Sequence, residues 1–145
     1  GHRAQRHVEL EALVKEHKQY LAQSLTKIQE NNSVEIMDNI QYFNGDDVKA
    51  SVVGTIAGML LNNYDWQKPI VGYTHIDSDT PGYKVSLRCS RLLGYDGVHY
   101  GNLVRDISQK CGGSGGGHSV ACGAYIPEDN IDQFLELLNN SVNFN

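Results

Sequence analysis

A run of glycines followed at once by a histidine is the part of this sequence best suited to chemistry. Five of the six residues from Gly112 to Gly117 are glycine, and His118 comes next. Ordering glycine is entropically expensive, so a dense run indicates a backbone with positive φ or a close approach by another group. Consecutive backbone N–H groups in such a turn form a concave, partly positive nest, and an imidazole can donate a hydrogen bond to phosphate. The run therefore predicts an anion-binding loop; the alternative is a flexible Gly/Ser linker.

A second candidate group lies in a stretch that alternates in the manner of a β-strand. From Lys84 to Cys89, Val85 and Leu87 alternate with polar residues. Residues two apart on a strand share one face of the sheet. The hydroxyl of Ser86 and the guanidinium of Arg88 are therefore expected side by side on one face.

The charge distribution favours a focused anion site over a broad basic surface. The chain has a net charge of −5, which argues against a general nucleic-acid binder. The segment 84–110 carries five basic and two acidic residues, a net charge of +3, which leaves −8 for the rest. A basic segment beside a glycine-rich loop on an acidic body fits a local anion site. An ordinary scatter of surface charge is the alternative.

Length and composition indicate one globular domain. The chain has 145 residues, of which 40% are hydrophobic, and no apolar run is long enough to span a bilayer. No signal peptide is visible, and three cysteines without CxxC spacing argue against a disulfide framework or a structural zinc site. We therefore expect a cytoplasmic protein with no membrane partner. Because the chain begins Gly1-His2 without methionine, we expect a piece of a longer protein with a cloning scar.

The hydrophobic pattern predicts an α/β fold, with helices packed on a mixed sheet of four or five strands. Helices are expected over 8–30, 48–63 and 102–110 and after Pro127, and strands over 40–43, 70–73, 84–89 and 119–126. The first helix fits this alternation least well. We therefore divide the chain into a connector helix (1–33) and an α/β domain (34–145).

Four segments resemble, in the same order, the C-terminal DHH-associated domain of RecJ-like DHH-family phosphoesterases. Val53–Leu60 resembles its first helix, and Lys68–Val71 resembles the strand that follows. Ser86–Ser90 resembles its Ser-x-Arg-x-Ser strand, and Gly115–Gly123 resembles its Gly-Gly-Gly-His-x-x-Ala-Ala-Gly loop. The resemblance covers about residues 48 to 140, and the insertion lengths look most like the archaeal branch.

The chain departs from the family pattern in two ways. Cys122 stands where the loop usually has a second alanine, which keeps the residue small but adds an oxidisable thiol. The metal-binding Asp-His-His motif of the family occurs nowhere in the 145 residues. We therefore expect no catalytic residue and no metal here, and a chain that is inactive alone. The resemblance implies that Mn²⁺ or Mg²⁺ is bound by the DHH domain of the parent protein, a single-strand exonuclease or related hydrolase.

The resemblance also implies a role for each candidate residue. Arg88 would clamp a phosphate, and Ser86 and Ser90 would donate hydroxyl hydrogen bonds to it. Backbone N–H groups would come from Gly115, Gly116 and Gly117, and His118 would contact a phosphate near the scissile bond. Alternatively, Arg88 is an ordinary surface residue of a strand and His118 is a structural histidine bonded to a neighbouring carbonyl.

Several partners are compatible with this resemblance. The ligand would be single-stranded DNA or RNA, a short oligonucleotide, or a nucleotide such as a cyclic dinucleotide. Archaeal relatives also associate with the replisome GINS complex, although no residue here indicates that contact. A glycine-rich domain of this kind also ends alanyl-tRNA synthetases, where it serves RNA binding and dimerisation. The long helix over 8–30 is compatible with that alternative, whereas the Ser-x-Arg-x-Ser strand favours the phosphoesterase.

Overall fold

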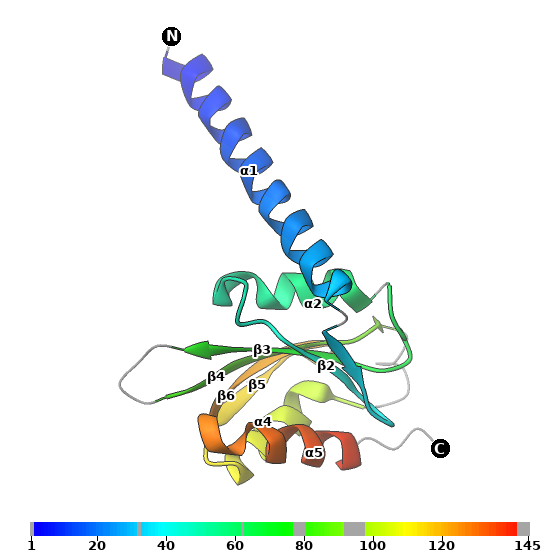
Figure 1. Ribbon diagram of the computed structural model, residues 1–145. Helices are drawn as coiled ribbons and strands as arrows, with labels where there is room; N and C mark the ends of the chain where they lie inside the picture. The colour runs from blue at the N-terminus through cyan, green and yellow to red at the C-terminus, as the bar shows by residue number, and fades with distance from the viewer. Residues whose placement is uncertain (1, 32, 62, 77–80, 92–97, 142–145) are drawn as a thin grey trace.

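A mixed β-sheet forms the middle layer of this protein (Figure 1). The computed structural model describes residues 2–31, 33–61, 63–76, 81–91 and 98–141. Its elements follow one another in the order α1 (His2–Glu30), β1 (Val34–Ile36), β2 (Gln41–Asn44), η1 (Ala50–Val52), α2 (Val53–Leu61), β3 (Ile70–Ile76), β4 (Gly82–Arg88), α4 (Tyr100–Lys110), β5 (Ser114–Gly117), β6 (Ala121–Pro127), η2 (Glu128–Asn130) and α5 (Ile131–Ser141).

The strands lie in the order β1-β2-β3-β4-β6-β5. The β2–β3 pair is parallel, and the other neighbouring pairs are antiparallel. A parallel pair needs a crossover connection, which α2 supplies. The predicted mixed α/β fold is confirmed, but the sheet has six strands within the described residues rather than four or five. The extra strands are the two edges: β1 is very short, and β5 lacks the side chains whose alternation would mark a strand.

Helices cover both faces of the sheet (Figure 1). On one face α2 buries its apolar side, which includes Val53, Ile56 and Leu60. On the other face α4 and α5 pack around fully buried Tyr100 and Phe134. Apolar residues of α4 and α5 recur at helical spacing, so burying one stripe of each helix stabilises this layer.

The first helix projects away from the rest of the domain (Figure 1). Ser24 and Ile28, near its C-terminal end, are 7% and 5% exposed. Towards the other end, Leu10 and Leu13 are 60% and 61% exposed, although they are as apolar as Ile28. Apolar periodicity thus predicted the helix correctly, whereas burial follows the contact with α2. Among the described helices, none is both long and apolar enough to cross a membrane.

Residues Ser114–Gly117 of the glycine run form an edge strand, so the predicted loop is wrong for them, whereas Gly112 lies in a turn. Residues Ser114–Gly117 pair antiparallel with β6, and Gly116 lies opposite Gly123. Positive φ is nevertheless found within the run, at +81° for Gly112, +146° for Gly116 and +143° for Gly117. An extended chain with these angles suits glycine alone, which explains why the composition resembled that of a turn. After the turn that follows β5, β6 begins at Ala121 rather than at 119, and it ends at Pro127 rather than before it.

Candidate functional site

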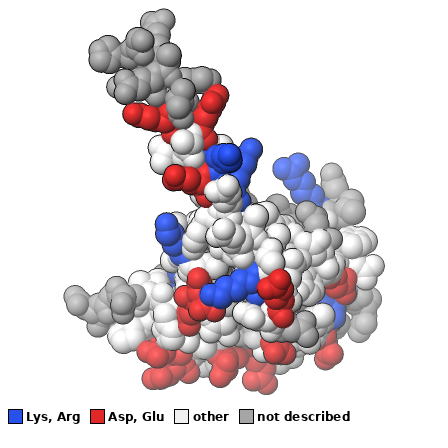
Figure 2. Space-filling model, turned by 45° about the horizontal axis from the view of Figure 1, so that its top comes forward, with Lys and Arg blue, Asp and Glu red and all other residues white. Residues whose placement is uncertain are grey.

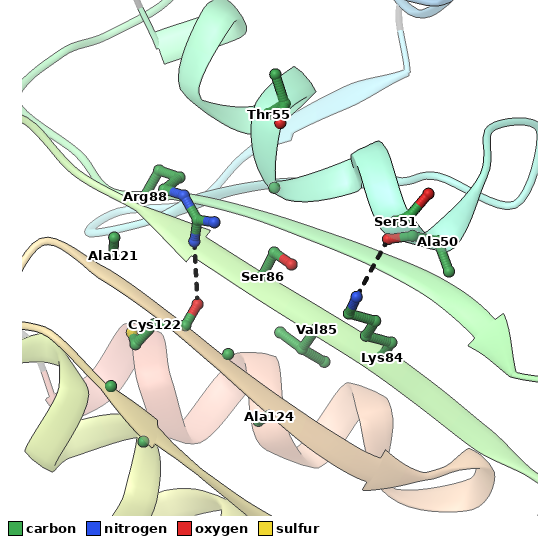
Figure 3. A pocket seen from close by; sticks show the side chains of 14 residues that line it. Ala50, Ser51, Thr55, Lys84, Val85, Ser86, Arg88, Ala121, Cys122 and Ala124 are labelled. Carbon is green, nitrogen blue, oxygen red and sulfur yellow. Dashed lines mark hydrogen bonds between the residues drawn. The ribbon is translucent and has the colours of Figure 1, made fainter.

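A pocket of about 480 Å³ opens between α2 and the centre of the sheet (Figure 3). Residues of η1 and the first turn of α2 form one wall, and β4 forms the floor. The glycine-rich parts of β5 and β6 form the opposite wall. We call this cavity the Arg88 pocket. Its volume lies within the range of small-molecule sites and is large enough for one nucleotide.

Three polar side chains from β4 enter the Arg88 pocket. Lys84, Ser86 and Arg88 alternate with apolar residues and point to the same side of the strand (Figure 3), as predicted for Ser86 and Arg88. Lys84 is exposed, Arg88 is half-buried and Ser86 is 6% exposed. The Nζ of Lys84 donates a long hydrogen bond, 3.4 Å, to the carbonyl oxygen of Ala50.

The guanidinium of Arg88 is held on one side and left open on the other. Its Nη1 donates to the carbonyl oxygens of Leu87, at 2.8 Å, and Cys122, at 3.2 Å. An arginine carries five N–H donors, and those of Nε and Nη2 have no acceptor among the described residues. No described carboxylate forms an ion pair with Arg88 or Lys84. Neither Nε nor Nη2 is among the fully buried polar atoms that lack a partner, so these N–H groups are accessible to solvent or to an external acceptor.

Hydroxyl groups on the helical wall complete the pocket. Ser51 and Thr55 are exposed and line it together with the buried hydroxyl of Ser86. We did not predict Ser51, Thr55 or Lys84 as site residues. The sequence nevertheless indicated that Ser51 and Thr55 lie together, because residues four apart share one face of a helix. Lys84 likewise lies in the alternation that identified Ser86 and Arg88.

The structure brings some of the other predicted residues to the pocket and leaves others outside it. Gly116 and Gly117 line the pocket, whereas Gly115, Ser90 and His118 are not among its lining residues. The backbone N–H of His118 donates to the carbonyl oxygen of Ala121, at 2.9 Å, and so closes the turn between β5 and β6. The imidazole is exposed and has no partner among the described residues, so it is not a histidine bonded to a neighbouring carbonyl.

The thiol of Cys122 is poorly suited to be a nucleophile. Its residue is 5% exposed, and burial raises the pKa of the thiol to about 12, although Arg88 acts to lower it. A thiol with such a pKa is protonated at neutral pH. The backbone carbonyl of Cys122, rather than its sulfur, meets Arg88. The departure from alanine at this position is therefore compatible with the pocket's geometry.

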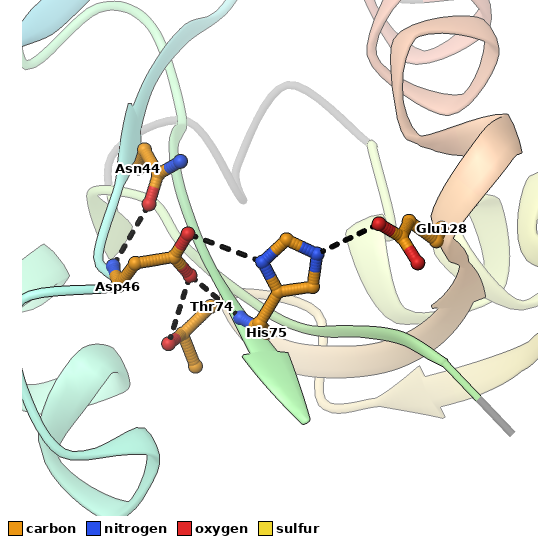
Figure 4. Close-up of polar contacts among 5 residues, drawn as sticks. All are labelled: Asn44, Asp46, Thr74, His75 and Glu128. Atoms are coloured by element: carbon orange, nitrogen blue, oxygen red, sulfur yellow. Dashed lines mark hydrogen bonds and ion pairs between the residues drawn. The ribbon is translucent and has the colours of Figure 1, made fainter. Parts of the chain in front are cut away.

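A second polar cluster lies at the end of β3, outside the pocket (Figure 4). The Nδ1 of His75 lies 3.2 Å from Asp46 Oδ2, and its Nε2 lies 3.3 Å from Glu128 Oε1. The backbone N–H of His75 also donates to Asp46 Oδ1, at 2.7 Å. We call Asp46, His75 and Glu128 the His75 cluster. It joins the turn after β2, the end of β3 and the start of η2.

Proton binding in the His75 cluster is set by its two carboxylates. Desolvation acts to lower the pKa of His75, but hydrogen bonds to Asp46 and Glu128 outweigh it and raise that pKa. Burial acts to raise the pKa of Asp46, but hydrogen bonds from the backbone and ring of His75 outweigh it and lower that pKa. Both ring nitrogens face carboxylates, an arrangement that suits the doubly protonated imidazolium.

Neither polar group is arranged to hold a divalent metal ion. The two nitrogens of His75 face different carboxylates, so one ion cannot contact all three side chains of the His75 cluster. Within the described ranges, no other three His, Cys, Asp or Glu side chains gather as metal ligands would. The side chains that the structure describes are therefore not arranged as the ligands of a metal-bound reaction centre.

The surface of the domain carries no extended basic area on the face seen in Figure 2. Acidic side chains line the lower edge of that face, and basic side chains are scattered above it. The net charge of −5 agrees with this distribution. On this face, attraction of an anion would depend on local groups rather than on a broad basic area.

Comparison with known sequences identifies one family. Residues 17–143 match the family model of the DHHA1 domain. The chain is 34% identical over 117 residues to the uncharacterized protein MJ0831 of Methanocaldococcus jannaschii, a match that covers 79% of this chain and 24% of that protein. It is also 48% identical over 46 residues to MJ0988 of the same organism, which covers 32% of this chain and 14% of that protein. The chain thus spans about a quarter or less of these relatives.

Solved structures share the fold at low sequence identity. One is a DHH-domain protein, PF0399, described as a member of a family of ribosomal proteins, with a TM-score of 0.62 and 18% identity over 90% of this chain and 32% of that one. Another is the C-Ala domain of Aquifex aeolicus alanyl-tRNA synthetase, with a TM-score of 0.57 and 15% identity over 74% of this chain and 95% of that one. At these identities the likeness extends to the fold alone.

Proposed function

Because this chain belongs to the DHHA1 domain family, which is associated with DHH phosphoesterases, we propose that the Arg88 pocket binds a phosphate of a nucleic acid or nucleotide. The observation that carries this proposal is the pair of cations, Arg88 and Lys84, without a described carboxylate partner. Phosphate offers several acceptor oxygens and a full negative charge, which match unpaired N–H donors beside hydroxyl groups.

Each part of the pocket has a defined task in this proposal. The free N–H groups of Arg88 donate to phosphate oxygens, and Lys84 adds a positive charge at the open side. The hydroxyls of Ser51, Ser86 and Thr55 donate further hydrogen bonds. Glycine at Gly116 and Gly117 leaves the wall without side chains, so that a phosphate can approach the backbone.

The parent protein is proposed to be a metal-dependent phosphodiesterase, in the manner of a RecJ-like single-strand exonuclease. Hydrolysis of a phosphodiester is assisted by divalent ions that activate water, and the residues described here are not arranged to bind them. Mn²⁺ or Mg²⁺ would be held by the DHH domain of the parent, and the Arg88 pocket would hold the substrate against it.

An RNA-binding module like the C-Ala domain is the second candidate. It is favoured by the fold shared with that domain and by the exposed apolar residues of α1, including Leu10 and Leu13. In that case the helix, rather than the Arg88 pocket, would carry the interaction. The two candidates therefore predict binding at different places on the same chain.

Titration by NMR separates the two candidates. Inorganic phosphate, dTMP and a dT hexamer are added separately to the isotopically labelled 145-residue chain. We expect weak, salt-sensitive binding, with Kd on the order of 0.1–1 mM. Amide shifts should appear first at Thr55, Gly116 and Gly117. Arg88→Ala should weaken binding about ten- to a hundredfold, because it removes a charge-assisted contact of roughly 1.5–3 kcal/mol.

Arg105→Ala is the matched control, because Arg105 is exposed on α4 and does not line the pocket. It should leave the affinity for phosphate nearly unchanged. Equal losses from the two arginine variants would contradict the proposal, since they would indicate attraction by net charge alone. Shifts confined to α1 on addition of RNA would favour the second candidate instead.

A further inference from the structure

The guanidinium of Arg88 lies directly against the backbone of α2, at Gly54. A Cβ added to Gly54 would lie 2.5 Å from Nη2 of Arg88 and 3.1 Å from its Cζ. The first distance is shorter than real Cβ contacts allow, so the guanidinium occupies the space that a side chain would need. A close contact of this kind restricts the rotamers of a long side chain such as arginine, which otherwise has many. We call the contact surface at Gly54 the seat of the guanidinium.

The backbone of Gly54 gives no other reason for glycine. Positive φ among the described glycines occurs at Gly112, Gly116 and Gly117, and Gly54 lies inside the helical residues of α2. Glycine is a poor helix former, so an ordinary helical position would favour alanine. What alanine would displace is the end of the Arg88 side chain.

A second glycine of α2 shows that the seat is specific. Gly58 lies one turn after Gly54, and a Cβ added there would meet nothing within 4 Å. Alanine at residue 58 is therefore sterically free, whereas alanine at residue 54 collides with Arg88. The same helix thus offers a test position and a matched control.

We propose that Gly54 is a positioning residue for Arg88. With Gly54 behind it and the carbonyls of Leu87 and Cys122 holding Nη1, the guanidinium is fixed in one orientation. The N–H groups of Nε and Nη2 then stay available to a ligand. What those groups bind rests on the function proposed above, but the way in which the guanidinium is held does not.

The test compares Gly54→Ala with Gly58→Ala in the 145-residue chain. The Nε–Hε resonance of Arg88, assigned by its loss in Arg88→Lys, reports the guanidinium without any ligand. It should shift or broaden in Gly54→Ala and stay in place in Gly58→Ala. Inorganic phosphate should bind about tenfold more weakly to Gly54→Ala than to the wild type, since a charge-assisted hydrogen bond is lost. Gly58→Ala should bind it as the wild type does.

Thermal stability separates positioning from a general structural role. Replacing glycine by alanine within a helix favours folding, so Gly58→Ala should melt a few degrees above the wild type, and Gly54→Ala should melt no lower than it. A large fall in the melting temperature of Gly54→Ala would overturn the proposal, because Gly54 would then be needed for packing.

A double-mutant cycle completes the test. In the Arg88→Lys background the shorter amine leaves room for a methyl group, so Gly54→Ala should cause no further loss of phosphate binding. Equal losses in both backgrounds, or an unmoved Nε–Hε resonance in Gly54→Ala, would overturn the positioning role. If Arg88→Lys and Arg88→Ala bind phosphate as the wild type does, the proposed function fails while the resonance still tests the seat.

Discussion

The Arg88 pocket and the His75 cluster are both built from charged side chains, but of these described side chains only those of the cluster are paired with opposite charges. Each ring nitrogen of His75 faces a carboxylate within 3.3 Å. By contrast, Arg88 donates to two backbone carbonyls, and no described carboxylate pairs with it or with Lys84. The difference indicates that the cluster fastens parts of the fold together, whereas the pocket has charges left over for the external anion of the proposed function.

The surroundings of the two regions agree with this division. The His75 cluster joins a turn, the end of β3 and the start of η2, and the centroid of the His75 ring lies 4.1 Å from that of Tyr83. The Arg88 pocket instead lies over the C-terminal part of β4 and the N-terminal part of β6, two strands that each have a paired neighbour on both sides. A rigid floor of this kind suits a binding site, because its donors keep their positions when the ligand leaves.

Replacing Gly117 by valine should have the largest effect on stability and on phosphate binding, since it distorts one wall of the pocket. Gly117 has φ of +143°, which a β-branched residue strongly disfavours, and its Cβ would lie 2.9 Å from Cα of Cys122. We expect the free energy of unfolding to fall by about 3 kcal/mol or more, measured by urea denaturation, with loss of phosphate binding. Ser114→Val on the same exposed edge is the control and should be nearly neutral. Equal stability of the two variants would contradict the geometry of β5.

A carboxylate at Thr55 should make the pocket resemble the His75 cluster. Thr55→Glu places a negative charge among Arg88 and Lys84, so the cations gain an internal partner and an incoming phosphate is repelled. We expect phosphate binding to weaken at least about tenfold, measured by NMR titration, without loss of stability. Glutamine has nearly the same shape as glutamate but no charge, so Thr55→Gln should retain most of the affinity for phosphate. If the Glu and Gln variants bind equally well, the pocket is not the phosphate site.

Removing Lys84 should weaken binding less than removing Arg88. Lys84 is exposed, and its single described hydrogen bond is long, so water screens its charge. Lys84→Ala should weaken phosphate binding about two- to threefold, and the difference from the wild type should vanish at high salt. Lys110→Ala, at the exposed end of α4, should have no effect. A loss from Lys84→Ala as large as that from Arg88→Ala would make the two cations equal partners.

The smallest expected effect is a pH dependence of stability that belongs to the His75 cluster. The folded pKa of His75 is raised, so its contribution is fully present below the ordinary pKa of 6.5 and is lost as the pH rises through the folded value. The folded pKa of Asp46 is lowered, so its contribution is present above 3.8 and is lost as the pH falls through the folded value. The cluster should therefore stabilise most in mildly acidic solution.

The pH dependence of this contribution is tested by measuring the melting temperatures of the wild type and His75→Gln across the neutral and alkaline range. The difference between them should shrink as the pH rises, while phosphate binding at a fixed pH stays unchanged. His17→Gln, on the exposed surface of α1, is the control and should melt in parallel with the wild type at every pH. A difference that grows with pH would contradict the assigned sign.

Sequence patterns predicted the parts of this structure that depend on side-chain periodicity. The four strands with buried side chains, the helices and the mixed sheet followed from such patterns, and the alternation around Ser86 placed that residue and Arg88 on one face. The glycine strand was missed because Ser114–Gly117 offers no side chains to alternate. The missed site residues, Ser51 and Thr55, come from a helix whose position over β4 depends on tertiary packing. The contact between Gly54 and Arg88 is visible only in the structure, because it depends on how α2 packs over β4.

The close approach of α4 to β5 restricts the substitutions that the sequence can accept at residue 101. A Cβ at Gly101 would lie 2.2 Å from the carbonyl oxygen of Gly117, so the helix and the strand touch backbone to backbone. A side chain at residue 101 must push β5, and with it one wall of the Arg88 pocket. In a mutant library selected for ligand binding, position 101 should therefore be as intolerant as the pocket itself, although it does not line the cavity.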